Sequence, residues 1–431
     1  MTKEASRTGR AVSACLKRKT IAFILSIVFF LQLALGSMPL RASANAQETQ
    51  AISGYSPFSD VSAVGNAWLN DHPSLPVALP GVSAQSAVLI NGDTGEVLFR
   101  QNENVRLPMA STTKIMTALV AVEALPLHTM VKISAECVGI EGSSVYLTEG
   151  ELLSLEDLLY ALMLESANDA AIAIAVAVAG SVEAFAERMN EKALALGLSE
   201  THFTNPHGLD DEAHYTTAYE LSLIAKAALS HDELKAIMST QRRTIPMKDG
   251  SGVRLLLNHN KLLRSYEGAI GVKTGFTKKS GRCLVSAACR DGLTLIAVTI
   301  NDGNDWRDHT AMLDYGFSLY DTVELCPAGA YEAPLWVING TSEYVVIKNT
   351  DSLTMALPKD RGDLRCVVEI PRFTYAPVKK GQVVGRLVFY EENPDGSQTE
   401  LAEVPLYAQF EAASVIYKKS LLEKISDLLG F

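Results

Sequence analysis

The sequence has few cysteines, and none lies in a pattern that is typical of a metal site or a disulfide framework. Six of its 431 residues are cysteine. They form no Cys-x-x-Cys pair and no Cys/His cluster with zinc-binding spacing. Internal repeats and low-complexity tracts are absent as well. Nothing in the cysteine pattern points to a metal site, and we expect neither a metal nor a cofactor.

Positive charge is scarce outside the N-terminus. The formal net charge is −11, and residues 1–46 hold seven basic groups and one acid, so the rest of the chain carries −17. Nucleic-acid binding requires a basic face, and this charge argues against it. The hydrophobic fraction of 48% and charged fraction of 20% are those of a globular protein.

The first 46 residues have the order of a secretory signal peptide. Basic residues precede the apolar run 21–36, and small residues follow at Ala44 and Ala46. The apolar run is shorter than the roughly 20 residues that a membrane-spanning helix needs. We expect cleavage after Ala46 and export to the extracellular or periplasmic side of the cytoplasmic membrane. An uncleaved N-terminal anchor is the alternative.

The remaining chain divides into four parts by composition. Residues 47–80 are rich in Ser, Pro, Asn and Ala and predict a leader or linker. Residues 81–320 contain strand patterns at both ends and helical patterns between them, which predicts one α+β domain. Residues 321–410 contain short strand-like runs and predict a small all-β domain. Residues 411–431 predict an amphipathic C-terminal helix.

Two hairpins are predicted at the ends of the α+β domain. Residues 86–101 form two β-type runs around a Gly-Asp-Thr-Gly turn, and residues 283–300 form two apolar runs around Asp291-Gly292. We expect the late strands to pair with the first hairpin. The segment 305–320 predicts a helix that packs on this sheet, and the apolar segment 169–180 predicts a buried helix rather than a membrane span.

A serine and a lysine at helical spacing are the first candidates for chemistry. Ser111 follows Pro108 where a helix would begin, and Lys114 lies three residues later on the same face. A serine hydroxyl needs a base to become a nucleophile. A lysine can be that base only if burial or a neighbouring cation lowers its pKa. The alternative is an ordinary helix start with a surface lysine.

Two further motifs favour the catalytic interpretation. Ser166-Ala167-Asn168 lies between two helical segments, and Lys273-Thr274-Gly275 precedes the first strand of the late hairpin. Ser-x-x-Lys, Ser-Asp-Asn and Lys-Thr-Gly are the signature of penicillin-binding proteins and class A β-lactamases. This chain has Ala167 in place of the aspartate, which removes no catalytic atom. The chain thus resembles the serine D-Ala-D-Ala carboxypeptidases, the low-molecular-mass penicillin-binding proteins. The stretches "GSSVYLTEGE", "NPHGLDDEAHYTTAYEL" and "NHNKLL" extend the resemblance.

The resemblance implies a penicillin-binding, β-lactamase-like transpeptidase fold and assigns roles to the motif residues. Ser111 would attack the carbonyl between two D-alanines, with Lys114 as its base. Ser166 would relay a proton to the departing D-alanine, and Asn168 would hold the substrate amide. The substrates would be peptidoglycan stem peptides ending in D-Ala-D-Ala, and β-lactams would be covalent inhibitors.

The third motif would bind the substrate. Lys273 would lower the pKa of Lys114 and attract the terminal carboxylate, and Thr274 would hydrogen-bond that carboxylate. The residue after Gly275, Phe276, would supply one backbone N–H to the oxyanion, and Ser111 would supply the other.

Outside the three motifs, Arg307 falls where the family places a carboxylate-binding arginine, although a solvated arginine at a helix start is the alternative. We interpret His207 as a residue that orders a loop, with Asp210 as its local partner. His214 is interpreted as an ordinary polar or capping residue.

Several other functions stay open at this stage. A class A β-lactamase would need a glutamate for deacylation, but no Glu-x-x-Leu-Asn stretch lies between Asn168 and Lys273. A non-catalytic penicillin-binding scaffold would not need the complete motif set. An endopeptidase or transpeptidase of the same family is compatible with every motif, because the choice of leaving group depends on the shape of the pocket.

The C-terminal segment suggests contact with a membrane. Leu421, Leu422, Ile425, Leu428 and Leu429 recur at helical spacing. Positive charge comes from Lys418, Lys419 and Lys424. Such a helix can lie in the membrane interface. Packing on the all-β domain or on a partner is the alternative.

Overall fold

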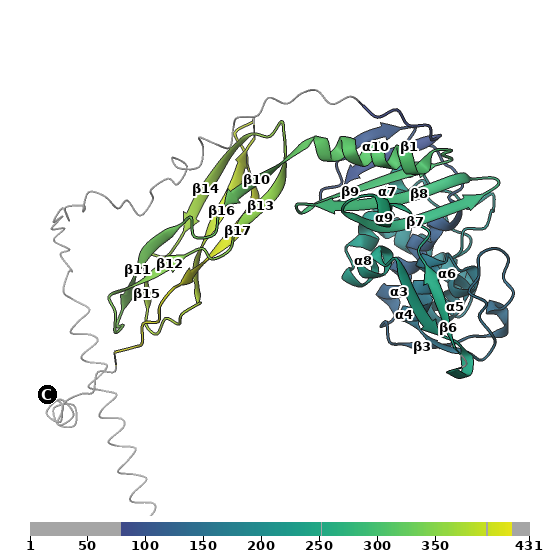
Figure 1. Ribbon diagram of the computed structural model, residues 1–431, viewed down its shortest axis with the longest axis horizontal. Coiled ribbons are helices and arrows are strands. Elements are labelled where there is room, and N and C mark those ends of the chain that lie inside the picture. Colours follow the sequence, from purple (N-terminus) through teal and green to yellow (C-terminus); the bar gives the residue numbers. More distant parts are fainter. Residues whose placement is uncertain (1–78, 251, 394, 416–431) are drawn as a thin grey trace, which may run out of the picture. The chain divides into compact units, whose positions relative to one another are not determined.

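The computed structural model describes residues 79–415 except 251 and 394 (Figure 1). Within this part of the chain, an α+β domain is followed by an all-β domain, which confirms the predicted fold class. The predicted signal peptide, residues 1–46, lies outside the described residues. The five cysteines that the structure describes are free.

The α+β domain is organised around one antiparallel sheet. Its strands, in spatial order, are β2 (Val97–Gln101), β1 (Ser86–Asn91), β9 (Leu293–Ile300), β8 (Gly281–Arg290) and β7 (Ala269–Thr277). Strand β1 pairs with β9, so the first hairpin and the late strands share the sheet as predicted. The β8–β9 turn uses Asp291 and Gly292, both at positive φ, as a two-residue hairpin turn of this sequence favours.

Successive residues of the strands face two different layers. Val88 and Ile90 of β1 pack into the helical layer, whereas Ala87 and Leu89 pack against α10 (Asp305–Ser318). This alternation is the period-two pattern of a sheet that is covered on both faces. It confirms the prediction that the segment 305–320 forms a helix on the sheet.

Six helices build the other layer (Figure 1). They are α3 (Lys114–Ala124), α4 (Leu155–Leu164), α5 (Asn168–Ala179), α6 (Val182–Ala195), α7 (Ala218–Leu229) and α8 (Asp232–Ser239). Helix α4 begins with a side-chain cap, in which the Ser154 hydroxyl accepts a hydrogen bond from the Asp157 amide. Most of α5 is buried, because its alanines and isoleucines pack on all sides.

Within the described ranges, no single helix is long and apolar enough to cross a membrane. Helices α5 and α6 together have the length and apolar composition of a membrane span, but the chain bends by 81° between them.

Short elements complete this domain. They are η1 (Ala110–Thr113), β3 (Met130–Lys132), η2 (Ala135–Cys137), β4 (Leu152–Ser154), β5 (Arg242–Pro246), η3 (Lys248–Gly250), β6 (Val253–Leu257) and α9 (Leu262–Ser265). The sequence patterns did not predict the β5–β6 hairpin, because its strands are short and largely exposed.

The all-β domain contains a two-stranded and a six-stranded sheet. The first pairs β10 (Tyr320–Cys326) with β13 (Leu353–Pro358). The second has the order β14 (Asp363–Glu369), β16 (Val383–Glu392), β17 (Gln398–Ala408), β12 (Tyr344–Lys348), β11 (Glu332–Ile338) and β15 (Phe373–Tyr375).

The start of the predicted C-terminal helix needs correction. Residues 411–415 are not helical: Ala412 forms a β-bridge with Val378, and Ser414 forms one with Gly340. Backbone pairing with the all-β domain therefore replaces the helix in this stretch. The rest of the predicted helix, residues 416–431, lies outside the described residues.

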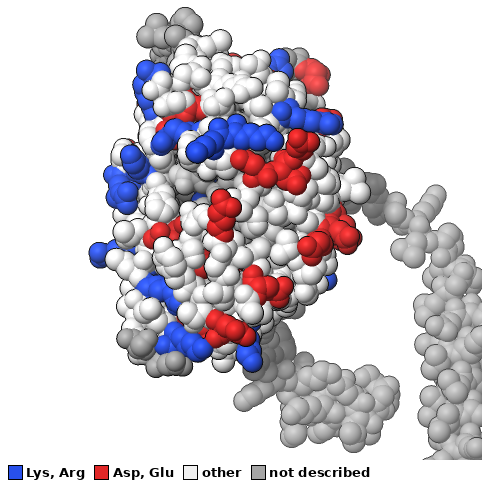
Figure 2. Space-filling view, turned by 90° about the vertical axis from the view of Figure 1, so that its right-hand side faces the viewer, with Lys and Arg blue, Asp and Glu red and all other residues white. Residues whose placement is uncertain are grey.

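Charged side chains of both signs are interspersed on the face of the molecule shown in Figure 2. Neither sign forms a continuous surface there.

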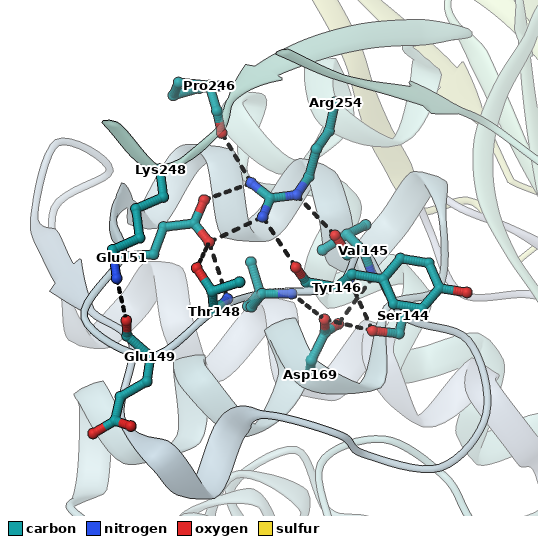
Figure 3. Close-up of polar contacts among 11 residues, drawn as sticks. Ser144, Val145, Tyr146, Thr148, Glu149, Glu151, Asp169, Pro246, Lys248 and Arg254 are labelled. Carbon is teal, nitrogen blue, oxygen red and sulfur yellow. Dashed lines mark hydrogen bonds and ion pairs between the residues drawn. The ribbon is translucent and has the colours of Figure 1, made fainter. Parts of the chain in front are cut away.

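An irregular segment before β4 is held against α5 by one buried carboxylate (Figure 3). Asp169, in the first turn of α5, accepts hydrogen bonds from the Ser144 hydroxyl at 2.6 Å and from the Leu147 amide at 3.0 Å. The Ser144 hydroxyl accepts one from the Tyr146 amide in turn. These bonds satisfy backbone donors that the segment cannot satisfy by itself.

Arg254, in the β5–β6 hairpin, binds the same segment through a second set of hydrogen bonds (Figure 3). The Arg254 guanidinium pairs with both carboxylate oxygens of Glu151, at 2.5 and 2.9 Å, and donates to the carbonyls of Val145 and Tyr146. The side chains of Arg254 and Glu151 are 10% and 1% exposed. Burial raises the pKa of Glu151, but the hydrogen bonds from Arg254 and Thr148 outweigh it and hold this pKa below the usual 4.5.

Replacing Arg254 by methionine should destabilise the α+β domain by about 3 kcal/mol, because Glu151 is then left buried without its partner. The loss should shrink at acidic pH. The lowered pKa means that the Glu151–Arg254 stabilisation is present above pH 4.5 and is lost as the pH falls through the lower folded value. The free energy of unfolding in urea at several pH values measures both effects.

The exposed pair Arg106–Glu200 provides a matched control. Arg106→Met should cost less than about 1 kcal/mol, because exposed ion pairs contribute little. Equal losses for R254M and R106M would contradict the role of the buried pair.

Candidate active site

The Ser-x-x-Lys motif lies at the junction of η1 and α3. Ser111 is in η1, and Lys114 is the first residue of α3. This 3-10 turn brings the side chains together, and the Lys114 Nζ donates a hydrogen bond of 3.0 Å to the Ser111 Oγ. The lysine is fully buried, so it is not the surface lysine of the alternative interpretation.

Oxygen atoms from two other segments complete the surroundings of the lysine. Its Nζ donates to the Asn168 Oδ1 at 2.7 Å and to the His207 carbonyl at 2.6 Å. Both acceptors are neutral. They orient the amine but supply no countercharge, so the charged form of Lys114 is not strongly favoured.

The pKa of Lys114 lies well below its usual value of 10.5. Burial is the main cause, because desolvation disfavours the ammonium, and repulsion by Lys273 adds to it. The carboxylate of Asp169 opposes the shift. A lowered pKa makes the neutral amine easier to form, and this form can accept a proton from a hydroxyl.

The Lys-Thr-Gly motif lies within strand β7, at the edge of the sheet and directly before β8, the first strand of the late hairpin. Lys273 is buried, its Nζ donates to the Thr274 carbonyl at 3.0 Å, and burial lowers its pKa to about 7. A β-carbon at Gly275 would come within 3.1 Å of the Ser111 amide nitrogen. Glycine at this position therefore lets the edge strand approach the serine closely.

The Ser-x-Asn motif connects α4 to α5. Ser166 is buried and has φ 58°, and Asn168 begins α5. The Asn168 side chain bridges two segments, because its Oδ1 accepts from Lys114 and its Nδ2 donates to the Glu141 carbonyl at 2.6 Å. The segment that Asp169 and Arg254 hold thus also contacts Asn168.

Not all of the predicted substrate-binding residues lie near the Ser-x-x-Lys motif. Thr274 and Gly275 lie on β7 next to Lys273, and the side chain of Phe276 is 65% exposed. Arg307 lies on α10, is exposed, and pairs with the adjacent Asp308 at 3.1 Å. Hydrogen bonds from Lys114 join Ser111, Lys114 and Asn168 into one cluster, whereas Arg307 bonds to Asp308.

The histidines have structural environments. Burial, with repulsion from Lys114, lowers the pKa of His207 to about 3, and its ring accepts from the Leu209 amide. The partner predicted for it was wrong: Asp210 instead accepts from the Thr277 hydroxyl of β7. His214 is buried rather than an exposed cap, and its ring contacts the Thr113 hydroxyl at 2.7 Å.

Sequence reasoning missed several supporting residues. Asp169, Glu151 and Arg254 hold the segment that contacts Asn168, and Gly208 lies against the Ala110 carbonyl where no β-carbon would fit. Asp169 directly follows the Ser-x-Asn motif and could have been noticed. The Arg254–Glu151 pair spans more than a hundred residues, and no local pattern signals it. In the described part of the chain, no group of three or more His, Cys, Asp or Glu could hold a metal ion.

Comparison with known proteins agrees with this geometry. The family profile described as D-alanyl-D-alanine carboxypeptidase matches residues 74–304, and that of the penicillin-binding protein 5 C-terminal domain matches residues 320–413. The D-alanyl-D-alanine carboxypeptidase DacF of Bacillus subtilis is 34% identical over 337 residues, which cover 76% of this chain and 85% of that protein.

Solved structures give the same result. The D-alanyl-D-alanine carboxypeptidase DacD from Francisella tularensis has a TM-score of 0.55 and 26% identity, over 84% of this chain and all of that one. The Streptomyces K15 DD-transpeptidase has a TM-score of 0.54 and 34% identity, over 56% of this chain and all of that one. The chain therefore belongs to the peptidase S11 family and is a D-alanyl-D-alanine carboxypeptidase, a hydrolase of cell-wall metabolism.

Proposed function

We propose that Ser111 is the nucleophile and Lys114 its base. The observation that carries this proposal is the 3.0 Å contact between the Ser111 Oγ and a buried amine with a lowered pKa. The neutral amine accepts the hydroxyl proton while the Oγ attacks the carbonyl carbon between the two D-alanines. The C–N bond breaks, Ser166 passes a proton to the leaving amine, and an acyl-ester remains on Ser111. Water then hydrolyses this ester and restores the hydroxyl.

The edge strand β7 is suited to hold the substrate. The backbone N–H groups of Ser111 and Phe276 would stabilise the oxyanion. Thr274 and the Lys273 ammonium would bind the terminal carboxylate, and the Asn168 amide would hold the substrate amide. Because Arg307 lies outside the cluster around Ser111, we assign carboxylate binding first to Lys273 and Thr274. The same acyl-ester chemistry would make penicillin a covalent inhibitor.

A second candidate reaction is transpeptidation. The related Streptomyces K15 enzyme bears the name DD-transpeptidase, and the two reactions differ only in whether water or an amine attacks the acyl-ester. An endopeptidase acting on cross-links would use the same residues. Adding an amino-acid acceptor to the reaction mixture distinguishes transfer from hydrolysis.

The proposed setting is the outer side of the cytoplasmic membrane. Residues 1–46 would direct export and be removed, 47–80 would be a linker, and 81–320 and 321–410 would be the catalytic and all-β domains. The segment after Val415 would lie in the membrane interface, since its apolar residues recur at helical spacing.

Mass spectrometry after incubation with benzylpenicillin and, separately, with a diacylated Lys-D-Ala-D-Ala peptide tests the proposal. We expect a stable penicilloyl adduct on the peptide that contains Ser111, and free D-alanine from the second substrate. Ser111→Ala should abolish both. An adduct on S111A, or D-alanine release by it, would refute the assignment of the nucleophile.

Lys114→Arg should lower the rate of penicillin acylation by at least about a hundredfold, because arginine cannot become a neutral base. Stopped-flow measurement of the acylation rate checks this. Lys192→Arg, at an exposed ion pair with Glu123, is the matched control and should acylate normally. Undiminished acylation by K114R would show that another group takes the proton.

Asn168→Asp should shift the pH dependence of kcat/KM to higher pH. The new carboxylate would stand 2.7 Å from the Lys114 Nζ and raise the lysine pKa, so a higher pH is needed to produce the neutral amine. The acidic limb of the pH profile measures the shift. An unchanged limb would mean that Lys114 does not control it.

A further inference from the structure

One end of the all-β domain has an apolar outer face. Strands β12, β11 and β15 are neighbours at the edge of the six-stranded sheet (Figure 1). The aromatic patch, as we call it here, consists of Trp336, Ile338, Tyr344, Phe373 and Tyr375. Each of these side chains is between 38% and 63% exposed.

Strand register makes the patch continuous. Trp336 stands opposite Tyr344 on one neighbouring strand and Phe373 on the other, and Ile338 stands opposite Tyr375. The ring centroids of Trp336 and Tyr344 are 6.1 Å apart, and those of Phe373 and Tyr375 are 5.6 Å apart. Side chains at paired positions share a face of the sheet, so these five residues form one surface rather than scattered exposures.

The other end of the same outer face has the opposite character. Arg386 on β16 pairs with Glu369 on β14 at 2.7 Å and with Glu403 on β17 at 2.6 Å. These ion pairs are exposed to water. The buried residues that β11, β12, β16 and β17 contribute to the core of this domain lie on the inner side. The fold therefore does not require an apolar outer face. A contiguous exposed apolar surface indicates a site of interaction.

The course of the chain points to the occupant of this surface. The last described residue, Val415, donates its amide to the Asn339 carbonyl, and Ser414 bridges to Gly340. Both partners directly follow Ile338 of the patch. The sixteen residues that continue from there, 416–431, have the sequence of an interfacial segment. The segment proposed to enter the membrane interface thus begins beside the aromatic patch.

The composition of the patch also suits a lipid surface. Tryptophan and tyrosine have an apolar ring with one polar group and concentrate at the headgroup level of bilayers. Exposed basic residues flank the patch along the chain, at Arg372 before β15 and at Lys379 and Lys380 after it. Basic side chains next to an apolar surface favour anionic headgroups.

From this juxtaposition we infer that the aromatic patch is a second membrane-contacting surface, which rests on the lipid interface beside the C-terminal segment. This inference depends on the proposed membrane placement of residues 416–431. It adds to that anchor a second contact, made by a folded domain. A single contact at one point of the chain leaves the orientation of a domain free, whereas two adjacent contacts restrict it.

Fluorescence tests this inference directly, because the chain has three tryptophans. In a chain without residues 1–46, Trp68→Phe and Trp306→Phe leave Trp336 as the only emitter. Vesicles of phosphatidylethanolamine and phosphatidylglycerol should shift its emission to shorter wavelength, and brominated lipids should quench it. An emission that vesicles leave unchanged would overturn the inference.

Vesicle co-sedimentation provides the mutational test. The triple variant Trp336→Ser, Phe373→Ser and Tyr375→Ser should bind at least about tenfold more weakly, from the apolar area lost. Leu194→Ser removes an even more exposed apolar side chain, from α6, and should bind normally. D-alanine release from a soluble peptide should be unchanged in all variants, which shows that they are folded.

The alternatives give distinct results, each of which refutes the lipid contact. If residues 416–431 cover the patch, Trp336 is shielded from water even without vesicles, and it becomes exposed when residues 416–431 are deleted. If a second copy covers it, the emission depends on protein concentration. If the triple variant binds normally while deletion of 416–431 abolishes binding, the C-terminal segment alone contacts lipid and the proposed anchoring survives. If the intact chain does not bind, both proposals fail.

Discussion

The burial of two lysines side by side is the constraint on which the active site depends. Lys114 and Lys273 are both almost completely removed from water, and each ammonium would be costly there without a countercharge. The protein surrounds Lys114 with neutral acceptors and places a like charge nearby, which shifts its equilibrium toward the neutral amine. This arrangement favours the neutral amine, which is the form that can take a proton from a serine hydroxyl.

Keeping these lysines buried requires several segments that have no chemistry of their own. The segment before β4 contacts Asn168, and Asp169 and Arg254 hold it in place. The loop around His207 brings a carbonyl to Lys114, and Gly208 lets this loop lie directly against Ala110. These two irregular segments therefore help to exclude water from the Lys114 amine.

The outer face of the all-β domain has two ends of different polarity. One end carries solvent-exposed ion pairs, and the other carries exposed aromatic side chains. Both ends share a single inner core. Such a division is possible because alternate residues of a strand face opposite sides, so an outer surface can change without disturbing the packing beneath it.

Local patterns in the sequence were sufficient for the fold class, the two hairpins, the main helices and the three motifs, because hydrophobic periodicity and turn residues act over a few positions. The sequence alone did not determine that Lys-Thr-Gly lies on an edge strand against Ser111, that Asp210 binds Thr277 rather than His207, or that Arg254 pairs with Glu151. These contacts join residues that are dozens to more than a hundred positions apart. Only packing of the complete domain selects them, since many distant partners are chemically equivalent until the chain has folded.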